Sequence, residues 1–182
     1  MLAQTHLKQQ LDALRHSNVS GFVRLRVAAN VDLFPGWLAA QTLYPRIYWQ
    51  ARGPRSPEYV ALGAIHELTR PADIQRVCDL ANSNSEDSPR YYGGLAFDPA
   101  QPGWQGFGPC RFVLPRIELV RRGECVSLCL NLWLTDGNLD AELQAICPGN
   151  LSTSGTSWVC FSFQAVPHTP LPKPIRVQAT GP

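Results

Sequence analysis

The sequence predicts an α+β fold in which helices flank a largely antiparallel sheet. Two observations support this prediction. Strand candidates follow one another through short, turn-rich joins, whereas a parallel sheet would need strict alternation of strands and helices. Hydrophobic residues make up 45% of the 182 residues and charged residues only 16%, below the roughly 25% charged share of an average soluble chain. The chain is therefore expected to bury a core, and its length suits one domain.

Residues 3–15 begin the fold with the pattern of an amphipathic helix. Their leucines stand at i, i+4 and i+7 with polar residues between them: Leu7, Leu11 and Leu14. Residues 22–27 then alternate, with aliphatic side chains on one face and Arg24 and Arg26 on the other. This alternation is typical of a half-buried strand.

A short helix and a hairpin are expected next. Asp32 suits the N-cap of a helix that ends near Pro45, because the residue before a proline avoids helical backbone. Residues 46–50 and 58–68 are predicted to form two antiparallel strands. The segment between them, residues 53–57, is dense in Gly, Pro and Ser and therefore favours a turn.

The following segments add a helix, a loop and three strands. Pro71 suits the first turn of a helix. Residues 90–97 are predicted to be a short strand, and residues 98–109 a loop rich in Gly and Pro. Residues 110–121 and 125–134 are two long strand candidates joined by a tight turn.

Residues 125–134 show the clearest pattern in the sequence. Aliphatic residues occupy every second position, so one face of this strand must lie in the core: Val126, Leu128, Leu130, Leu132 and Leu134. A last helix is expected to begin near Asn138, with Leu143 and Ile146 as apolar positions. Residues 147–149, Cys-Pro-Gly, should end it.

The composition changes after this helix. Residues 148–182 contain a run of Ser and Thr at residues 152–157 and several closely spaced prolines. Such a composition favours a semi-extended segment rather than a packed one. We therefore predict an α+β region over residues 1–147 and a tail or linker over residues 148–182.

Charge and hydropathy exclude two classes of partner. The net charge is +2, and Arg121 and Arg122 form the one adjacent basic pair, so no nucleic acid partner is expected. No run approaches the ~18 apolar residues of a membrane span, and the first residues lack the pattern of a signal peptide. No membrane partner is expected, and a cytoplasmic location is predicted.

The six cysteines are expected to be reduced thiols. Cys125 and Cys129 are the closest pair, and four residues of extended strand span about 13 Å. This distance exceeds the roughly 7 Å between Cα atoms that a disulfide allows, and it prevents one zinc ion from binding both sulfurs. Reduced cysteines are typical of a cytosolic protein.

No residue is predicted to be catalytic, to bind a cofactor or to hold a metal, because the motifs for these functions are missing. Lys8 and Lys173 are the two lysines, and neither is placed for the burial that makes a lysine a general base. His66 is expected to be an ordinary strand histidine. Arg116 and Glu118 should share a strand face and form an ion pair on the sheet surface.

Trp104 and Phe107 are the candidate functional residues. Both are large aromatic side chains in the loop of residues 98–109. Such side chains either fold back over a sheet or present a contact surface to a partner. The residues alone favour neither interpretation.

Five segments follow one another in the order and spacing of a known family: WLAAQ (37–41), YPRIYWQ (44–50), ALGAI (61–65), YYGGLAFD (91–98) and RFVLPRIE (111–118). Together they resemble the amino-terminal region of isochorismate synthases, especially those of the menaquinone pathway. The resemblance covers residues 22–146. It places the chain among the chorismate-utilising enzymes and implies the outer strands and helices of their α+β fold.

The resemblance also limits the function that can be expected. In that family the catalytic lysine, the acid glutamate and the magnesium-binding glutamates lie in a larger carboxy-terminal half, which this sequence does not contain. The resemblance therefore implies no catalytic or metal residue here. Mg²⁺ is expected for the whole enzyme, but no cofactor is expected in this chain. Trp104 and Phe107 become candidates for a contact with the missing half.

The sequence leaves three functions open. The preferred one is the non-catalytic amino-terminal portion of an isochorismate synthase, with the catalytic carboxy-terminal half as its partner in cis or in trans. The second is a stand-alone binding or interaction module that retains the scaffold without the enzyme. The third is turnover of chorismate by this chain itself, which we expect not to occur.

Overall fold

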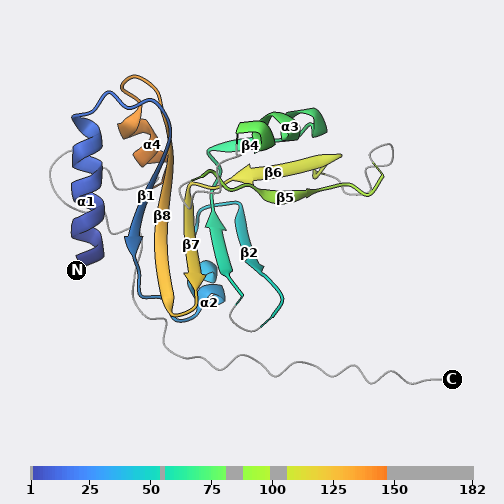
Figure 1. Cartoon of the computed structure of the whole chain (residues 1–182), viewed down its shortest axis with the longest axis horizontal. Helices are drawn as coiled ribbons and strands as arrows, with labels where there is room; N and C mark the ends of the chain where they lie inside the picture. Colours follow the sequence, from blue (N-terminus) through green and yellow to red (C-terminus); the bar gives the residue numbers. More distant parts are fainter. Residues whose placement is uncertain (1, 54–55, 81–87, 99–105, 147–182) are drawn as a thin grey trace.

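The computed structural model describes residues 2–53, 56–80, 88–98 and 106–146 (Figure 1). Within these ranges the helices are α1 (Leu2–Arg15), α2 (Phe34–Ala39), α3 (Pro71–Leu80) and α4 (Leu139–Ile146). The strands are β1 (Gly21–Ala28), β2 (Arg46–Gln50), β3 (Glu58–Leu62), β4 (His66–Leu68), β5 (Tyr92–Leu95), β6 (Cys110–Leu114), β7 (Ile117–Arg122) and β8 (Cys125–Leu134). None of the helices described is long and apolar enough to cross a membrane.

The strands form two antiparallel sheets. One sheet has the order β1-β8-β7-β3-β2, and the other has the order β4-β6-β5. Every pair in both sheets is antiparallel. The predicted α+β fold is therefore confirmed, as is the hairpin of β2 and β3. The predicted tail of residues 148–182 lies outside the described residues, so the boundary at residue 147 stays a prediction.

One face of the five-stranded sheet forms the main apolar core. Helices α1, α2 and α4 contribute Leu11, Trp37 and Leu143 to this core. The alternating leucines of β8 lie beneath them, so the core face predicted for residues 125–134 is confirmed. Figure 1 shows α1 and α4 beside β1 and β8, with α2 near the lower ends of the strands. Burial of each such leucine contributes about 1.5–3 kcal/mol.

Two long strands expected from the sequence are each broken in two. Residues 58–68 form β3 and β4, because Gly63 takes a φ of +65°, a conformation that costs glycine little. Residues 110–121 form β6 and β7, because Pro115 has no N–H to donate to a strand ladder. The two breaks lie opposite each other, since β3 pairs with β7 and β4 pairs with β6. The three-stranded sheet therefore turns away from the five-stranded one (Figure 1).

The expected N-cap of α2 is wrong. Leu33, not Asp32, occupies the cap position, and its side chain makes no capping hydrogen bond. Pro35 lies in the first turn, where its missing N–H has little cost. The carbonyl oxygens of Val31 and Asp32 instead accept hydrogen bonds from Arg121 Nη2 at 2.8 and 2.6 Å, which holds this segment against β7.

Helix α2 also ends earlier than expected, at Ala39 rather than near Pro45. The side-chain amide of Gln41 donates to the carbonyl oxygen of Trp37 at 3.0 Å. The backbone N–H of Gln41 bonds to Leu38 instead, at 3.2 Å. The buried side chain of Gln41 therefore bonds to the Trp37 carbonyl oxygen, which would accept the backbone N–H of Gln41 if the helix continued.

Candidate functional site

The second face of the five-stranded sheet is polar and aromatic. Strand alternation places Glu118 of β7 and Asn131 of β8 on this face, opposite the aliphatic core. Both residues have 0% exposure to solvent. A fully buried glutamate is rare and needs partners for its charge. Two of these partners are Tyr92 of β5 and Arg90, which lies just before that strand.

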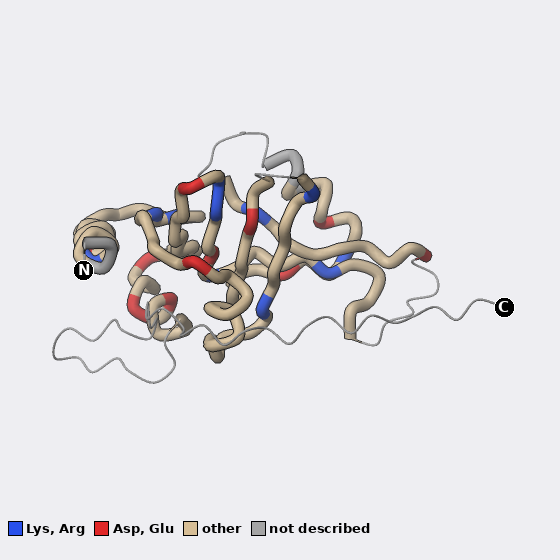
Figure 2. Tube along the Cα trace, turned by 90° about the horizontal axis from the view of Figure 1, so that it is seen from below, with Lys and Arg blue, Asp and Glu red and all other residues tan. Residues whose placement is uncertain are grey.

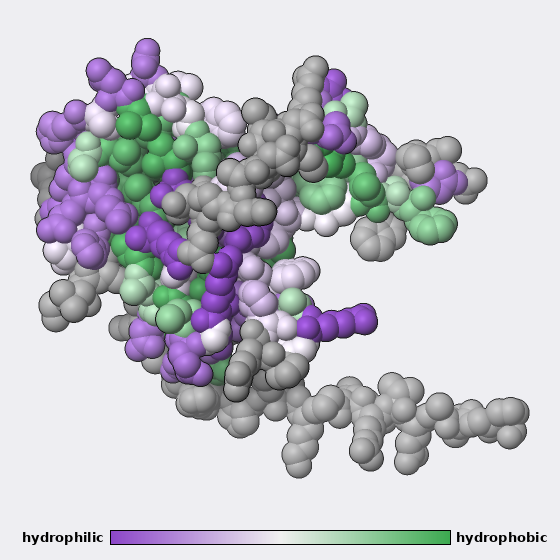
Figure 3. All heavy atoms as spheres, in the orientation of Figure 1, coloured by the Kyte–Doolittle hydropathy of each residue, from purple (hydrophilic) through white to green (hydrophobic). Residues whose placement is uncertain are grey.

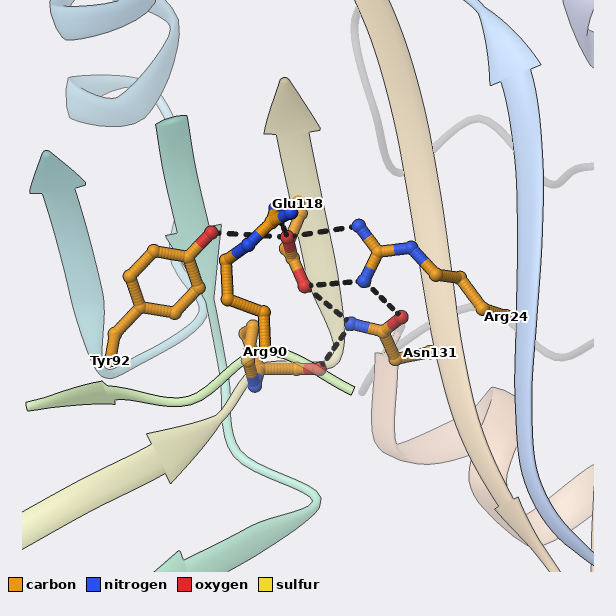
Figure 4. A network of polar contacts seen from close by, with 6 residues as sticks. Arg24, Arg90, Tyr92, Glu118 and Asn131 are labelled. Atoms are coloured by element: carbon orange, nitrogen blue, oxygen red, sulfur yellow. Dashed lines mark hydrogen bonds and ion pairs between the residues drawn. The ribbon is translucent and has the colours of Figure 1, made fainter. Parts of the chain in front are cut away.

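Four side chains converge on the carboxylate of Glu118 (Figure 4). Arg24 donates two hydrogen bonds, from Nη1 to Oε1 at 2.8 Å and from Nη2 to Oε2 at 3.1 Å. Arg90 Nη1 and the Tyr92 hydroxyl donate to Oε2 at 3.2 and 3.1 Å, and Asn131 Nδ2 donates to Oε1 at 2.9 Å. We call these five residues the Glu118 network. The two hydrogen bonds from the Arg24 guanidinium to the Glu118 carboxylate form a bidentate ion pair, which is strong and geometrically specific.

Asn131 connects this network to the break between β6 and β7. Its backbone N–H donates to the carbonyl oxygen of Arg116 at 2.8 Å, and its side-chain Nδ2 donates to the carbonyl oxygen of Pro115 at 2.9 Å. Its Oδ1 accepts a hydrogen bond from Arg24 at 3.2 Å. The network therefore satisfies backbone groups at the point where the two sheets diverge.

Burial and charge determine the protonation of the groups around Glu118. Burial raises the pKa of Tyr92 well above its ordinary value of 10.0, and the charge of Glu118 raises it further. Burial alone lowers the pKa of Arg24, but the hydrogen bonds and charge of Glu118 outweigh this, so the net pKa is raised. The Tyr92 hydroxyl thus stays a donor, and Arg24 stays a cation.

The free energy of unfolding is expected to fall as the pH rises above 10.0. In the unfolded chain Tyr92 loses its proton at its ordinary pKa of 10.0, whereas the folded protein keeps that proton to higher pH. The unfolded state then binds fewer protons, so the stabilisation present below pH 10.0 is lost progressively above it. Urea unfolding at about pH 8 and about pH 10.5 measures this fall. The Tyr92→Phe variant should show a smaller one, and an equal fall in both proteins would contradict the assignment.

A cleft of about 580 Å³ lies beside the network, where the two sheets diverge. In Figure 3 the surface is hollowed on the right, below the arm that carries β5 and β6. The described residues that line it are mostly aromatic or apolar and include two arginines but no acidic residue: Pro45, Ile47, Trp49, Tyr59, Arg90, Tyr91, Tyr92, Gly93, Phe107, Arg111, Phe112 and Val113. We call this the aromatic cleft.

Tilted ring contacts join the aromatic cleft to the Glu118 network. The ring centroid of Tyr59 lies 5.4 Å from that of Trp49 and 6.3 Å from that of Tyr92. The guanidinium carbon of Arg90 lies 4.5 Å from the Tyr59 ring centroid, a cation–π distance. Arg90 thus contacts the buried carboxylate and the cleft wall at once.

The candidate residues from the sequence have different outcomes. Phe107 lines the aromatic cleft and is half-buried, whereas Trp104 lies outside the described residues. Their contact with another domain stays a prediction. His66 is exposed on β4, with Nδ1 2.8 Å from the Tyr91 hydroxyl and its ring stacked on Trp133 at 6.0 Å between centroids.

The expected ion pair between Arg116 and Glu118 is wrong. Residues i and i+2 lie on the same face of a sheet only when both belong to one continuous strand. Arg116 lies in the break between β6 and β7, so this rule does not apply to it. Its Nη1 instead pairs with Glu142 Oε2 of α4 at 2.7 Å, on the helix-covered side of the sheet. Glu118 is therefore a buried residue on the opposite face, not a surface one.

The sequence did not predict which residues contact Glu118. Arg24 and Arg90 lie 94 and 28 residues away along the chain, so spacing alone cannot pair them with it. One signal was available in the sequence. Glu118 is flanked by Ile117, Leu119 and Val120, and a run that is apolar at both odd and even positions is typical of a strand buried on both faces.

The part of the chain that the structure describes offers no fitting magnesium site. No group of three or more His, Cys, Asp or Glu side chains lies close enough together in it to hold a metal ion. The oxygens of Glu118 accept hydrogen bonds from Arg24, Arg90, Tyr92 and Asn131. The described cysteines Cys110, Cys125 and Cys129 are free thiols.

The fold and the sequence together define the class of protein. The family model of the chorismate binding enzymes matches residues 9–153. The chain therefore belongs to the family of chorismate binding enzymes.

Within this family the chain is similar to MenF, an isochorismate synthase of Escherichia coli strain K12, with 37% identity over 97 residues. That match covers 53% of this chain and 20% of MenF. The solved structure of MenF, the menaquinone-specific isochorismate synthase from Escherichia coli, matches with a TM-score of 0.59 and 28% sequence identity. It covers 79% of this chain and 32% of that one. The chain thus spans less than a third of its relative's length.

Proposed function

We propose that this chain is the non-catalytic amino-terminal portion of an isochorismate synthase, the enzyme that converts chorismate to isochorismate. The proposal rests on comparing how much of this chain and how much of MenF the matches cover. The family match extends over residues 9–153, yet the MenF structure matches over only 32% of its own chain. The rest of such an enzyme would be the partner of this chain, in cis or in trans. Magnesium, a role in menaquinone synthesis and a cytoplasmic location belong to the same proposal.

The chemistry of the described residues supports a scaffold role. Glu118, the most buried carboxylate, is held by two arginines and cannot act as a free acid or base. Lys8 is exposed on α1, away from the Glu118 network. What these residues do is hold two diverging sheets together and present the aromatic cleft.

Two activity measurements test the proposal. The purified chain, incubated with chorismate and Mg²⁺, should show no turnover above background. A hybrid, in which this chain replaces the matching amino-terminal region of Escherichia coli MenF, should convert chorismate to isochorismate. Unmodified MenF is the positive control, and MenF lacking the same region is the negative control.

Either of two results would overturn the proposal. Robust turnover by the chain alone would show that it is a complete catalyst. A hybrid as inactive as the deletion control would show that the chain cannot serve as the amino-terminal portion of this enzyme.

A further inference from the structure

We infer that the aromatic cleft is the surface on which the carboxy-terminal portion of the enzyme docks. This inference rests on the proposed function and names the contact surface that it requires. The occupant is a polypeptide with an apolar contact patch. Four observations on the described residues support this choice.

The two faces of the five-stranded sheet are covered differently. Helices α1, α2 and α4 cover one face and bury its leucines. No described helix packs on the other face, where β5 and Arg90 cover the Glu118 network and the cleft remains open beside it. Sheets of α+β proteins are normally covered on both faces when both carry apolar residues. The cleft side is therefore the face on which a further layer would pack.

The residues at the cleft are of the kinds that dominate protein interfaces. Trp49 is 48% exposed although its ring contacts that of the buried Tyr59. Trp, Tyr and Arg are enriched among the residues that contribute most to binding between proteins. Six described residues of these kinds line the one hollow: Trp49, Tyr59, Arg90, Tyr91, Tyr92 and Arg111. A partner that fills the hollow would bury a large aromatic area.

Both lips of the cleft are sheet edges. In the two described sheets β2 pairs with β3 alone, and β5 pairs with β6 alone. Each of these edge strands has a single charged residue at most, Arg46 of β2. Edge strands that avoid pairing usually carry charges or prolines, whereas uncharged edges accept an additional strand. The partner can therefore pair its backbone with these edges while it covers the rings.

The two arginines at the cleft already have acidic partners within this chain. Arg90 and Arg111 line the cleft. Arg90 pairs with Glu118 at 3.2 Å and Arg111 pairs with Glu67 at 3.3 Å. Elsewhere on the described trace, blue and red residues are interspersed rather than gathered in one run (Figure 2). The contact with the docking portion is therefore expected to be mainly apolar, as the fully buried core of a protein interface is. The size of the partner follows from MenF, two thirds of whose chain lies outside the match.

Oxidative footprinting tests the docking surface without changing a residue. Trp49 and Tyr48 are adjacent on β2, have similar exposure at 48% and 42%, and lie on opposite faces of the strand. Hydroxyl radicals oxidise both rings, and mass spectrometry of the peptide resolves the two positions. The isolated chain is compared with the MenF hybrid. Trp49 should be oxidised at least about fivefold more slowly in the hybrid, because a core contact excludes solvent, whereas Tyr48 should not change.

A pair of variants provides an independent measurement. Trp49→Arg in the hybrid should lower the midpoint of thermal unfolding and reduce chorismate turnover at least about tenfold, as loss of a central interface residue does. Tyr48→Arg, the matched control, should lower the midpoint less and retain the turnover. In the isolated chain the two variants should lower the unfolding midpoint by similar amounts, since both side chains are about half exposed and each contacts a neighbour on β3, Trp49 the ring of Tyr59 and Tyr48 the carboxylate of Glu58.

The outcomes separate the two proposals. An inactive hybrid overturns the proposed function. An active hybrid in which Trp49 stays as reactive as in the isolated chain overturns the docking surface alone. Protection of Trp49 that grows with the concentration of the isolated chain would also overturn it, because the occupant would then be a second copy.

Discussion

Replacement of Glu118 by glutamine is expected to lower the free energy of unfolding by about 3–5 kcal/mol, the cost of breaking a buried ion pair from one side. The side chain of Arg24 is only 2% exposed, and its guanidinium group lies 2.8 Å from the carboxylate. Without the negative charge, Arg24 remains a buried cation beside a second cation, Arg90. Urea unfolding of wild type and Glu118→Gln at pH 7 measures the difference.

A second pair of variants shows that the effect comes from the unpaired charge. Arg24→Met alone should also be strongly destabilising, because it leaves the buried carboxylate with fewer donors. The double variant with Arg24→Met and Glu118→Gln should cost less than the sum of the single changes, since neither charge is then left alone. Strict additivity would contradict the pairing.

An exposed ion pair provides the control for charge removal. Arg15 and Asp140 approach to 2.7 Å, but both side chains are open to solvent. Asp140→Asn should therefore cost about 1 kcal/mol or less, the range of surface pairs. A loss as large as that of Glu118→Gln would mean that burial is not what makes the Glu118 network important.

The elements that follow from local pattern could be predicted from the sequence. Alternation along residues 125–134 identifies the leucine face of β8, and the leucine spacing of residues 3–15 identifies α1. Both depend on side chains that repeat within a few residues, so no knowledge of distant contacts is needed. The turn-rich residues between β2 and β3 likewise indicate a hairpin before any tertiary contact is known.

The elements that depend on distant contacts could not be predicted in this way. Gly63 and Pro115 are each ordinary inside a strand candidate, and only the pairing of β3 with β7 and of β4 with β6 aligns the two breaks. The aromatic cleft exists because the sheets diverge there. Its lining residues come from four strands, from the residues just before β2 and β5 and from the loop of Phe107, so no single segment could indicate it.

The burial of Glu118 could not be predicted from the sequence for a related reason. Strand alternation assigns a residue to a face but does not tell whether that face is covered. The cover is supplied by Arg90 and Tyr92, which lie 28 and 26 residues away from Glu118 along the chain. A glutamate within an apolar run is thus better interpreted as a buried ion pair whose partner is still to be found.

Replacement of Gly93 by alanine is expected to destabilise the protein by about 3 kcal/mol, the upper part of the range for inserting an atom into a packed region. A Cβ atom at Gly93 would lie 1.9 Å from the carbonyl oxygen of Arg111 and 2.6 Å from Phe112 Cα. Both are backbone atoms of β6, the strand that pairs with β5 in this register. They cannot rotate away as a side chain would, so β5 must separate from β6.

The neighbouring glycine is the matched control for this change. A Cβ atom at Gly94 would meet only Phe107 Cζ, at 3.8 Å, which is an ordinary contact distance. Gly94→Ala should therefore change the free energy of unfolding by less than about 1 kcal/mol, although it lies in the same strand. Thermal and urea unfolding of both variants compare the two positions directly. Because β5 carries Tyr92 over Glu118, Gly93→Ala should also reduce the alkaline loss of stability that depends on Tyr92. Equal stability of the two variants would show that β5 does not lie this close to β6.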